Sequence, residues 1–217
     1  MAEINLLDRL PTTKRDPKAR AATKTHEDRI IAKRFDRDFF DGERRHGYGG
    51  YRYDGRWLPV VQRFVEHYGL SSRACILDIG AAKGFLMHDF QSVLPRATIR
   101  GIDVSTYAKE NAHGGMGSLI DIGSAEKLPY PDHSFDLVVS INSIHNLPLA
   151  KCRQALREIE RVSRAHKYVT VDAWRTEEER KRLLDWILTA ETYMSVDDWL
   201  KVFTEVGYTG DYWWFIP

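Results

Sequence analysis

The sequence predicts an α/β fold: one open, doubly wound and mostly parallel sheet of six or seven strands with helices on both faces. Three observations support this class. Short apolar runs alternate with amphipathic helical segments from about residue 70 onward. The run 75–79 turns through Gly80 into a helix that begins at Phe85, whose free N–H groups face the crevice. The runs 98–103 and 135–141 lead into polar residues, as expected where parallel strands end at a ligand-binding edge.

Size and composition set limits on the function. The 217 residues, 43% hydrophobic and 29% charged, suit one domain with a full core. The 32 basic and 31 acidic residues leave a net charge of +1, which disfavours an RNA or DNA substrate without excluding one. No apolar run is long enough to span a membrane, and the polar N-terminus lacks the apolar centre of a signal peptide, so we expect a cytoplasmic protein. Cys75 and Cys152 are expected as small buried hydrophobes, and no metal site is indicated.

The loop after the first strand indicates the ligand. A dinucleotide fingerprint counted from Gly80 requires glycine at 82 and 85, where this chain has Ala82 and Phe85. The pattern present is D-x-G-x-x-x-G, from Asp78 to Gly84. It resembles motif I of the class I S-adenosylmethionine-dependent methyltransferases, a Rossmann-like family in which this loop cradles the methionine part of the cofactor.

Two further segments carry the same resemblance, which covers about residues 70–172. The second strand ends in Asp103, where the family has an acid that holds the ribose hydroxyls. Residues 123–139 are similar to the adenine-side loop and fourth strand of the type 11 branch, which includes quinone-biosynthesis enzymes. The chain departs from many relatives at Ser124, where they have an aspartate for the adenine amino group. The resemblance implies S-adenosylmethionine as cofactor, S-adenosylhomocysteine as product, and these cofactor-binding residues: Asp78, Gly80, Ala81, Gly84, Asp103, Val104, Ser124, Ala125 and Ile141.

The N-terminal third divides into two parts before the main domain at 70–217. Residues 1–25 are polar and basic, and we expect a flexible arm rather than a nucleic-acid or membrane-surface tail. Residues 26–69 are expected to form a lid that contains one helix over 26–41, an aromatic loop over 45–57 and a second helix over 57–68 stopped by Gly69.

The aromatic loop alternates glycines with tyrosines. Glycine permits unusual backbone angles, and tyrosine offers a flat apolar face with a hydroxyl, a combination suited to closing over a small polar or cationic ligand. We therefore predict that Tyr48, Tyr51, Tyr53 and Arg56 contact the substrate. The alternative is that the loop only packs the N-terminal helix onto the sheet.

Polar residues after strands four and five are candidates for the chemistry. Asn142, His145 and Asn146 follow strand 135–141, and Asp172, Trp174 and Arg175 follow strand 167–172. His145 suits proton acceptance by its ordinary pKa, and Asp172 could bind a substrate hydroxyl or ammonium or orient His145. The alternative for His145 is a purely structural hydrogen bond. We assign catalytic roles to Asn142, His145 and Asp172, and substrate contacts to Asn146, Trp174 and Arg175.

The C-terminal part predicts a helix over 176–190 with a capping box at Thr176, a helix after Ser195 that Gly207 ends, and one last strand over 208–216. Relatives usually end in a two-stranded hairpin. The sheet edge is therefore expected to be completed by the N-terminal segment or by a second subunit, so that a homodimer is possible.

These features predict a methyltransferase that moves a methyl group to an oxygen or nitrogen of a small polar metabolite, with a sugar or amino-metabolite preferred. The chain lacks the Asp/Asn-Pro-Pro-Tyr/Phe tetrapeptide expected after strand four in enzymes that methylate adenine or glutamine nitrogens. Two alternatives stay open. One is a cyclase or lyase that uses the same cofactor without methyl transfer, and the other is a non-catalytic, cofactor-binding partner protein.

Overall fold

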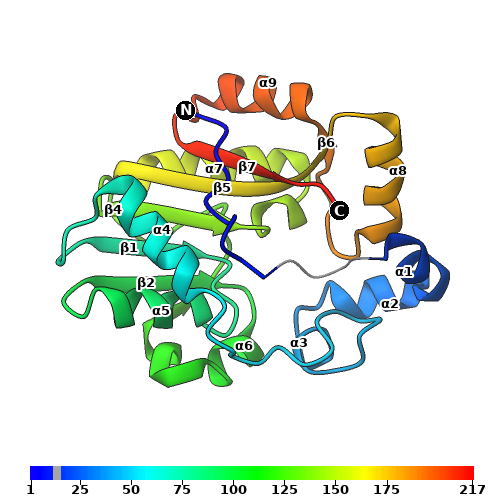
Figure 1. The fold of residues 1–217 in the computed structure, drawn as a ribbon, viewed down its shortest axis with the longest axis horizontal. Coiled ribbons are helices and arrows are strands. Elements are labelled where there is room, and N and C mark those ends of the chain that lie inside the picture. Colours follow the sequence, from blue (N-terminus) through cyan, green and yellow to red (C-terminus); the bar gives the residue numbers. More distant parts are fainter. Residues whose placement is uncertain (12–15) are drawn as a thin grey trace.

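Parallel strands form the centre of the molecule (Figure 1). The computed structural model describes residues 1–11 and 16–217. Within them, seven strands form one sheet in the order β3-β2-β1-β4-β5, and β6 and β7 both pair with β5. All these pairs are parallel. The strands are β1 (Cys75–Ile79), β2 (Thr98–Asp103), β3 (Ile120–Ile122), β4 (Phe135–Ile141), β5 (Ser163–Trp174), β6 (Met194–Ser195) and β7 (Asp211–Phe215). The predicted Rossmann-like α/β class is confirmed.

Helices cover both faces of the sheet. On one face, α4 (Leu58–Tyr68) and α5 (Phe85–Val93) bury Phe64 and Phe90 against Ile76 and Leu137 of the strands. On the other face, α7 (Leu149–Val162) and α9 (Val196–Val206) bury their apolar stripes against Val138. The remaining helices are α1 (Pro17–Thr23), α2 (His26–Ala32), α3 (Arg37–Phe40), α6 (Thr106–Glu110), η1 (His113–Leu119), η2 (Ile144–Asn146) and α8 (Glu177–Trp186). Burying both faces explains why the strands read as continuous apolar runs.

The N-terminal segment differs from the expected flexible arm. The amides of Ile4 and Tyr212 donate to the carbonyls of Tyr212 and Ala2, at 3.0 Å each, so this segment extends the sheet beside β7. Leu6 is fully buried, and the Tyr168 hydroxyl accepts from the Leu6 amide and donates to the Ile4 carbonyl. The predicted completion of the edge by this segment is confirmed. Lys14 and Arg15, which the sequence places in the arm, lie outside the described residues.

Contacts of Lys24, the residue directly after α1, hold this helix against α8. The Lys24 ammonium donates to the carbonyls of Leu184, Asp185 and Ile187 at 2.7–2.9 Å, which caps the C-terminal end of α8. Figure 1 shows α1 beside α8, with α2 and α3 next to them near the strand ends. Residues 16–25 therefore pack beside α8, because the Lys24 ammonium satisfies carbonyls that α8 leaves open.

The single helix predicted over 26–41 is wrong, because the structure has two. The backbone of Phe35 adopts a left-handed conformation with φ +50°, which ends α2, and Asp36 caps the start of α3. Ile30 of α2 is exposed. Periodicity alone could not detect this turn, since the apolar residues continue through it.

The helix predicted over 176–190 ends at Trp186. Its capping box is present, with Thr176 bonded to the Glu179 amide. The chain then returns toward β4, where the Glu191 and Thr192 amides donate to the His145 carbonyl at 3.0 and 2.9 Å. The helix that Ser195 caps and Gly207 ends is confirmed. Across residues 1–11 and 16–217, no helix is long and apolar enough to cross a membrane.

Candidate active site

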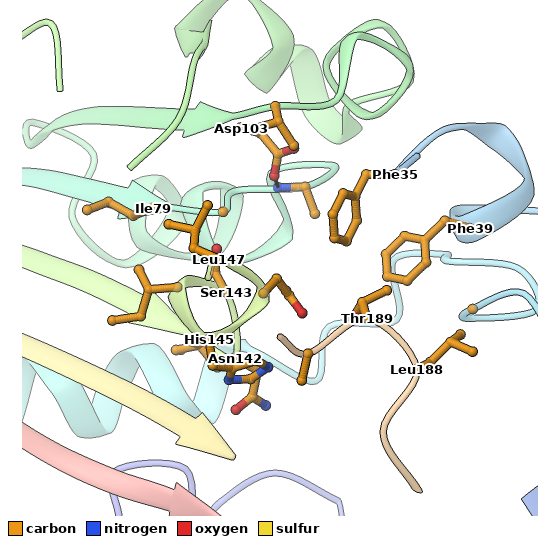
Figure 2. A pocket seen from close by; sticks show the side chains of 18 of the residues that line it. Phe35, Phe39, Ile79, Asp103, Asn142, Ser143, His145, Leu147, Leu188 and Thr189 are labelled. Carbon is orange, nitrogen blue, oxygen red and sulfur yellow. Dashed lines mark hydrogen bonds between the residues drawn. The ribbon is translucent and has the colours of Figure 1, made fainter. Parts of the chain in front are cut away.

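A cavity of about 420 Å³ lies at the carboxyl ends of the central strands. Its volume is within the usual range for small-molecule sites. One wall comes from the strand ends, and the other from the lid and from the segment after α8. Figure 2 shows Phe35 and Phe39 on the side opposite Asn142 and His145. Lining residues from the predicted cofactor and substrate sets are Tyr48, Gly80, Asp103, Val104, Ser124, Ala125, Ile141, Asn142, His145, Asn146 and Asp172.

The glycine turn requires its glycine for two reasons. Gly80 has φ +78°, a conformation that L side chains rarely adopt. A Cβ at this position would lie 2.1 Å from the Ser143 Oγ, so the loop after β4 closes directly on the turn. Two residues further, the backbone amide of Ala82 donates to the Asp103 carboxylate at 2.7 Å. This contact ties the turn after β1 to the end of β2.

Three buried carboxyl groups lie at or near the carboxyl ends of strands, Asp78 in β1, Asp103 in β2 and Asp172 in β5. Burial, followed by the nearby Asp103 charge, raises the pKa of Asp78 to about 7. Burial also raises the pKa of Asp103, although backbone amides of Ser105 and Ala82 partly offset this effect. Burial raises the pKa of Asp172 as well, and His145 opposes that change. Such an edge favours a ligand that brings positive charge, because a cation would offset the cost of ionising these acids.

His145 and Asp172 are brought together as a pair. The backbone amide of Asp172 donates to His145 Nδ1 at 3.2 Å, and His145 Nε2 lies 3.6 Å from Asp172 Oδ1. Burial lowers the pKa of His145, so its imidazole is neutral at pH 7. The Nδ1 lone pair is therefore occupied, and the proton is on Nε2, facing the carboxylate. In this arrangement Asp172 is the better proton acceptor.

Asn142 and Asn146 add polar groups beside this pair. Asn142 has φ +51°, and its Oδ1 accepts from the Thr170 hydroxyl at 2.9 Å. The Asn142 backbone N–H donates to the Thr170 carbonyl and hydroxyl, which fixes the turn after β4. The Asn146 Oδ1 is buried and has no hydrogen-bond partner. An unpaired buried acceptor in the wall of a cavity fits a ligand that donates a hydrogen bond there.

An ion pair that contains the buried Lys83 joins the lid to the glycine turn. The Lys83 ammonium donates to the Asp41 carboxylate at 2.5 Å and to the Tyr51 carbonyl at 3.2 Å. The Tyr107 hydroxyl donates to the same carboxylate at 2.7 Å. These contacts hold the lid against the loop that follows β1. Sequence analysis does not predict this pair, because Lys83 occupies a variable position of motif I.

Three predicted residues of the aromatic loop do not line the cavity. Tyr51 stacks on Phe85 with ring centroids 4.5 Å apart. The Tyr53 hydroxyl donates to Asp89 at 2.6 Å, and Arg56 pairs with Asp54. These contacts agree with the packing alternative for this part of the loop. Tyr48 alone, of the four residues predicted here, lines the cavity.

Five other predicted residues also lie outside the lining. Trp174 packs with the small apolar cluster around Leu183, and Arg175 pairs with Glu3 of the N-terminal segment. Trp174 is the last residue of β5 and Arg175 follows it, but neither lines the cavity. Asp78 of β1 and Ala81 and Gly84 of the glycine turn do not line it either. The lining residues that the sequence analysis missed are Arg20, Phe35, Phe39, Phe40, Arg44, Gly47, Ile79, Ala82, Ile102, Gly123, Ser143, Ile144, Leu147, Trp186, Leu188, Thr189, Ala190 and Phe215.

Comparison with known proteins identifies the domain. Residues 77–171 match the family model of a methyltransferase domain, type 11. This segment is therefore a methyltransferase domain. The family match contains the glycine turn, Asp103 and the strand that leads to Asn142, which are the parts that carry the sequence resemblance. S-adenosylmethionine is the cofactor of this family.

Two relatives are similar over most of this chain. An unconfirmed methyltransferase of Encephalitozoon cuniculi is 27% identical over 161 residues, which cover 72% of this chain and 67% of the relative. A tRNA (carboxymethyluridine(34)-5-O)-methyltransferase of Arabidopsis thaliana is 28% identical over 147 residues, which cover 67% of this chain and 34% of the relative. The chain thus spans about two thirds of the first relative and one third of the second.

Solved structures share the fold of this methyltransferase domain. The YcgJ protein of Bacillus subtilis has a TM-score of 0.55 at 21% identity, covering 67% of this chain and 66% of that protein. The [4+2]-cyclase SpnF has a TM-score of 0.55 at 22% identity, covering 69% and 56%. At these identities the likeness concerns the fold alone.

The residues of the methyltransferase cavity fit the cofactor. Asp103 is a buried hydrogen-bond acceptor suited to hydroxyl donors. The raised pKa values of the three edge acids match a ligand that carries a sulfonium and an ammonium group. The donor set and the charge therefore agree with S-adenosylmethionine on this wall.

Proposed function

We propose that the protein transfers the methyl group of S-adenosylmethionine to an oxygen or nitrogen of a small polar metabolite. The observation that carries this proposal is the buried Asn146 Oδ1 after β4, which has no hydrogen-bond partner and lines the cavity together with the Asp172 carboxylate. An unpaired acceptor there favours a ligand that donates a hydrogen bond, such as a hydroxyl or an amine. The aromatic lid supports a small acceptor, since Phe35 and Phe39 face the strand ends across the cavity.

The division of roles follows the two walls. Gly80, Asp103, Val104, Ser124, Ala125 and Ile141 would hold the cofactor, with Asp78, Ala81 and Gly84 shaping the turn behind them. Asn142, Asn146 and Tyr48 would position the acceptor. Bound S-adenosylmethionine supplies an electrophilic methyl carbon. The acceptor atom forms a bond to that carbon while the carbon–sulfur bond breaks and its electron pair stays on sulfur, and Asp172 takes the acceptor's proton.

His145 has a supporting role in this proposal. Its neutral Nε2–H faces the Asp172 carboxylate and directs that group, while the Nδ1 bond fixes the imidazole ring. Residues 26–69 act as the lid over the methyltransferase domain, together with α1. Orientation and exclusion of water account for most of the expected rate, as is general for such displacements.

A second candidate is the methylation of an RNA nucleotide. The similarity to the Arabidopsis tRNA methyltransferase favours it. The net charge of +1 does not, because phosphate contacts by lysine and arginine supply much of the affinity for nucleic acid. The fold is also similar to that of the SpnF cyclase, so the experiment below also tests the alternative of a cyclase or lyase without methyl transfer.

One labelling experiment separates these functions. The protein is incubated with methyl-labelled S-adenosylmethionine and, in separate arms, with a small-metabolite extract and with total tRNA. We expect label in a new small metabolite together with S-adenosylhomocysteine. Label in tRNA would replace the proposal with RNA methylation, and label retained on methylthioadenosine would replace it with cyclase or lyase chemistry.

A further inference from the structure

Two arginines face the cavity from the lid side. Arg20 comes from α1 and Arg44 from the segment after α3, and both line the cavity with Trp186 of α8. The Arg20 Cζ lies 4.7 Å from the centre of the Trp186 ring, and the Arg44 Cζ lies 6.0 Å from it. Two guanidinium groups from separate segments are thus gathered at one aromatic ring.

Neither guanidinium has an acidic partner among residues 1–11 and 16–217. Arg44 donates to the Gly47 carbonyl, and the Arg20 Nε is buried without a hydrogen-bond partner. Arg161 and Arg164, by contrast, pair with Glu158 and Asp136. Burial and the neighbouring Arg44 charge lower the pKa of Arg20 to about 10. Holding the two positive charges close together is therefore electrostatically unfavourable.

The arginine pair is held in place before any ligand arrives. Lys24, one residue after α1, donates to three carbonyls at the end of α8, so Arg20 and Trp186 have a fixed relation. The aromatic face of Trp186 orients the planar Arg20 guanidinium. Preorganised guanidinium groups bind phosphate and carboxylate groups in fork geometry.

We propose that Arg20 and Arg44 bind an anionic group, a phosphate or a carboxylate, of the methyl acceptor. The charges of the cavity support this assignment, since its acids lie at the strand ends and its arginines at the lid. A methyl acceptor that spans the distance between the strand ends and the lid would place a hydroxyl or amine near Asn146 and Asp172. Its anionic group would then lie at the arginine pair. The assignment of the anion to the methyl acceptor rests on the proposed methyl transfer. Binding of an anion by the two arginines does not depend on it.

The test measures binding of inorganic phosphate by titration calorimetry and phosphorus NMR, at constant ionic strength. We expect Arg20→Gln and Arg44→Gln each to weaken phosphate binding about fivefold, and the double variant at least tenfold. Arg34→Gln, which removes an exposed charge outside the cavity, is the matched control and should bind as the wild type does. Unchanged phosphate affinity in the double variant would overturn the proposal.

Two further arms identify the source of the anion. Wild-type protein saturated with S-adenosylmethionine should still bind phosphate, and competition between them would assign the arginines to the cofactor carboxylate and overturn the proposal. This arm needs no variant, so it holds even if the double variant fails to fold. Loss of tRNA binding in the double variant with phosphate binding unchanged would assign the arginines to an RNA backbone instead. If phosphate binding behaves as expected but no methyl transfer is found, the anion site stands and the proposed function falls.

Discussion

At the residue scale, the hydrogen bond from the Asp172 amide to His145 Nδ1 decides which group can accept a proton. A neutral imidazole with its lone pair already engaged is a poor base, whereas the buried Asp172 carboxylate keeps free acceptor capacity. The sequence predicted both residues at this edge from their positions after β4 and β5. It could not predict the tautomer, because that depends on a backbone amide from the neighbouring strand.

Replacing each member of the pair tests this assignment. We expect Asp172→Asn to lower kcat about 100-fold, because the proton acceptor is lost, and His145→Gln to lower it about tenfold, because only the orientation of Asp172 suffers. Since burial raises the pKa of Asp172, wild-type activity should fall as the pH drops through that raised pKa. Steady-state kinetics across pH and calorimetric titration of the cofactor check this. A larger loss in His145→Gln than in Asp172→Asn would make the histidine the base.

Gly80 offers a second test at this scale. Gly207→Ala, at a similar φ in open space, should cost about 1 kcal/mol of unfolding free energy. Gly80→Ala should cost about 2–4 kcal/mol, because its Cβ also meets Ser143. Urea denaturation measures both. The double variant Gly80→Ala/Ser143→Gly should recover the part due to the clash, and no recovery would show that the clash is not the cause.

At the scale of elements, the strands were predictable and the lid was not. Strands buried on both faces produce apolar runs that end at known positions, so β1, β2 and β4 lie where the sequence places them. The break at Phe35 and the end of α8 at Trp186 depend on tertiary contacts, namely the turn into the cavity and the Lys24 cap. Local sequence patterns do not predict such tertiary contacts.

The Lys83–Asp41 ion pair provides the test for the lid. Asp41→Asn leaves a buried ammonium group without its counterion, so we expect a loss of about 1–3 kcal/mol in unfolding free energy and about tenfold weaker cofactor binding. The matched control is Asp38→Asn, which changes an exposed carboxylate of α3. Calorimetry and urea denaturation give the two quantities. Equal behaviour of the two variants would mean that the ion pair does not hold the lid to the glycine turn.

At the scale of the whole molecule, the three acids at the strand ends set the pH dependence of stability. Folded Asp78, with a pKa of about 7, holds a proton that the unfolded chain releases near pH 4. Its contribution to stability is full below pH 4 and is lost as the pH rises to about 7. The cofactor-free protein should therefore lose stability over this interval, by up to about 4 kcal/mol from this group.

Asp78→Asn tests that dependence. The variant should match the wild type near pH 4 and exceed its unfolding free energy near pH 8, measured by urea denaturation without cofactor. Asp197→Asn, on the exposed side of α9, serves as the control and should keep the wild-type pH profile. If Asp78→Asn also keeps that profile, Asp78 does not hold its proton in the folded state.

The cofactor wall of the cavity was largely predictable, and the acceptor wall was not, for one reason. The wall proposed for the cofactor comes from short contiguous segments at the ends of β1, β2, β3 and β4, which the sequence pattern marks directly. The acceptor wall is assembled from Arg20, Phe35, Arg44, Trp186 and Phe215, which lie far apart in the chain. Only the folded lid brings them together.

This separation of the two walls has a consequence for engineering and evolution. Substitutions in α1–α3 and in the segment after α8 can change which molecule is methylated while the turns that hold the cofactor stay intact. A chimera that exchanges residues 16–57 with those of a related enzyme should inherit the donor's choice of acceptor and keep its own cofactor affinity. The lid is thus the exchangeable part of the enzyme, and new specificities can arise there without loss of the underlying chemistry.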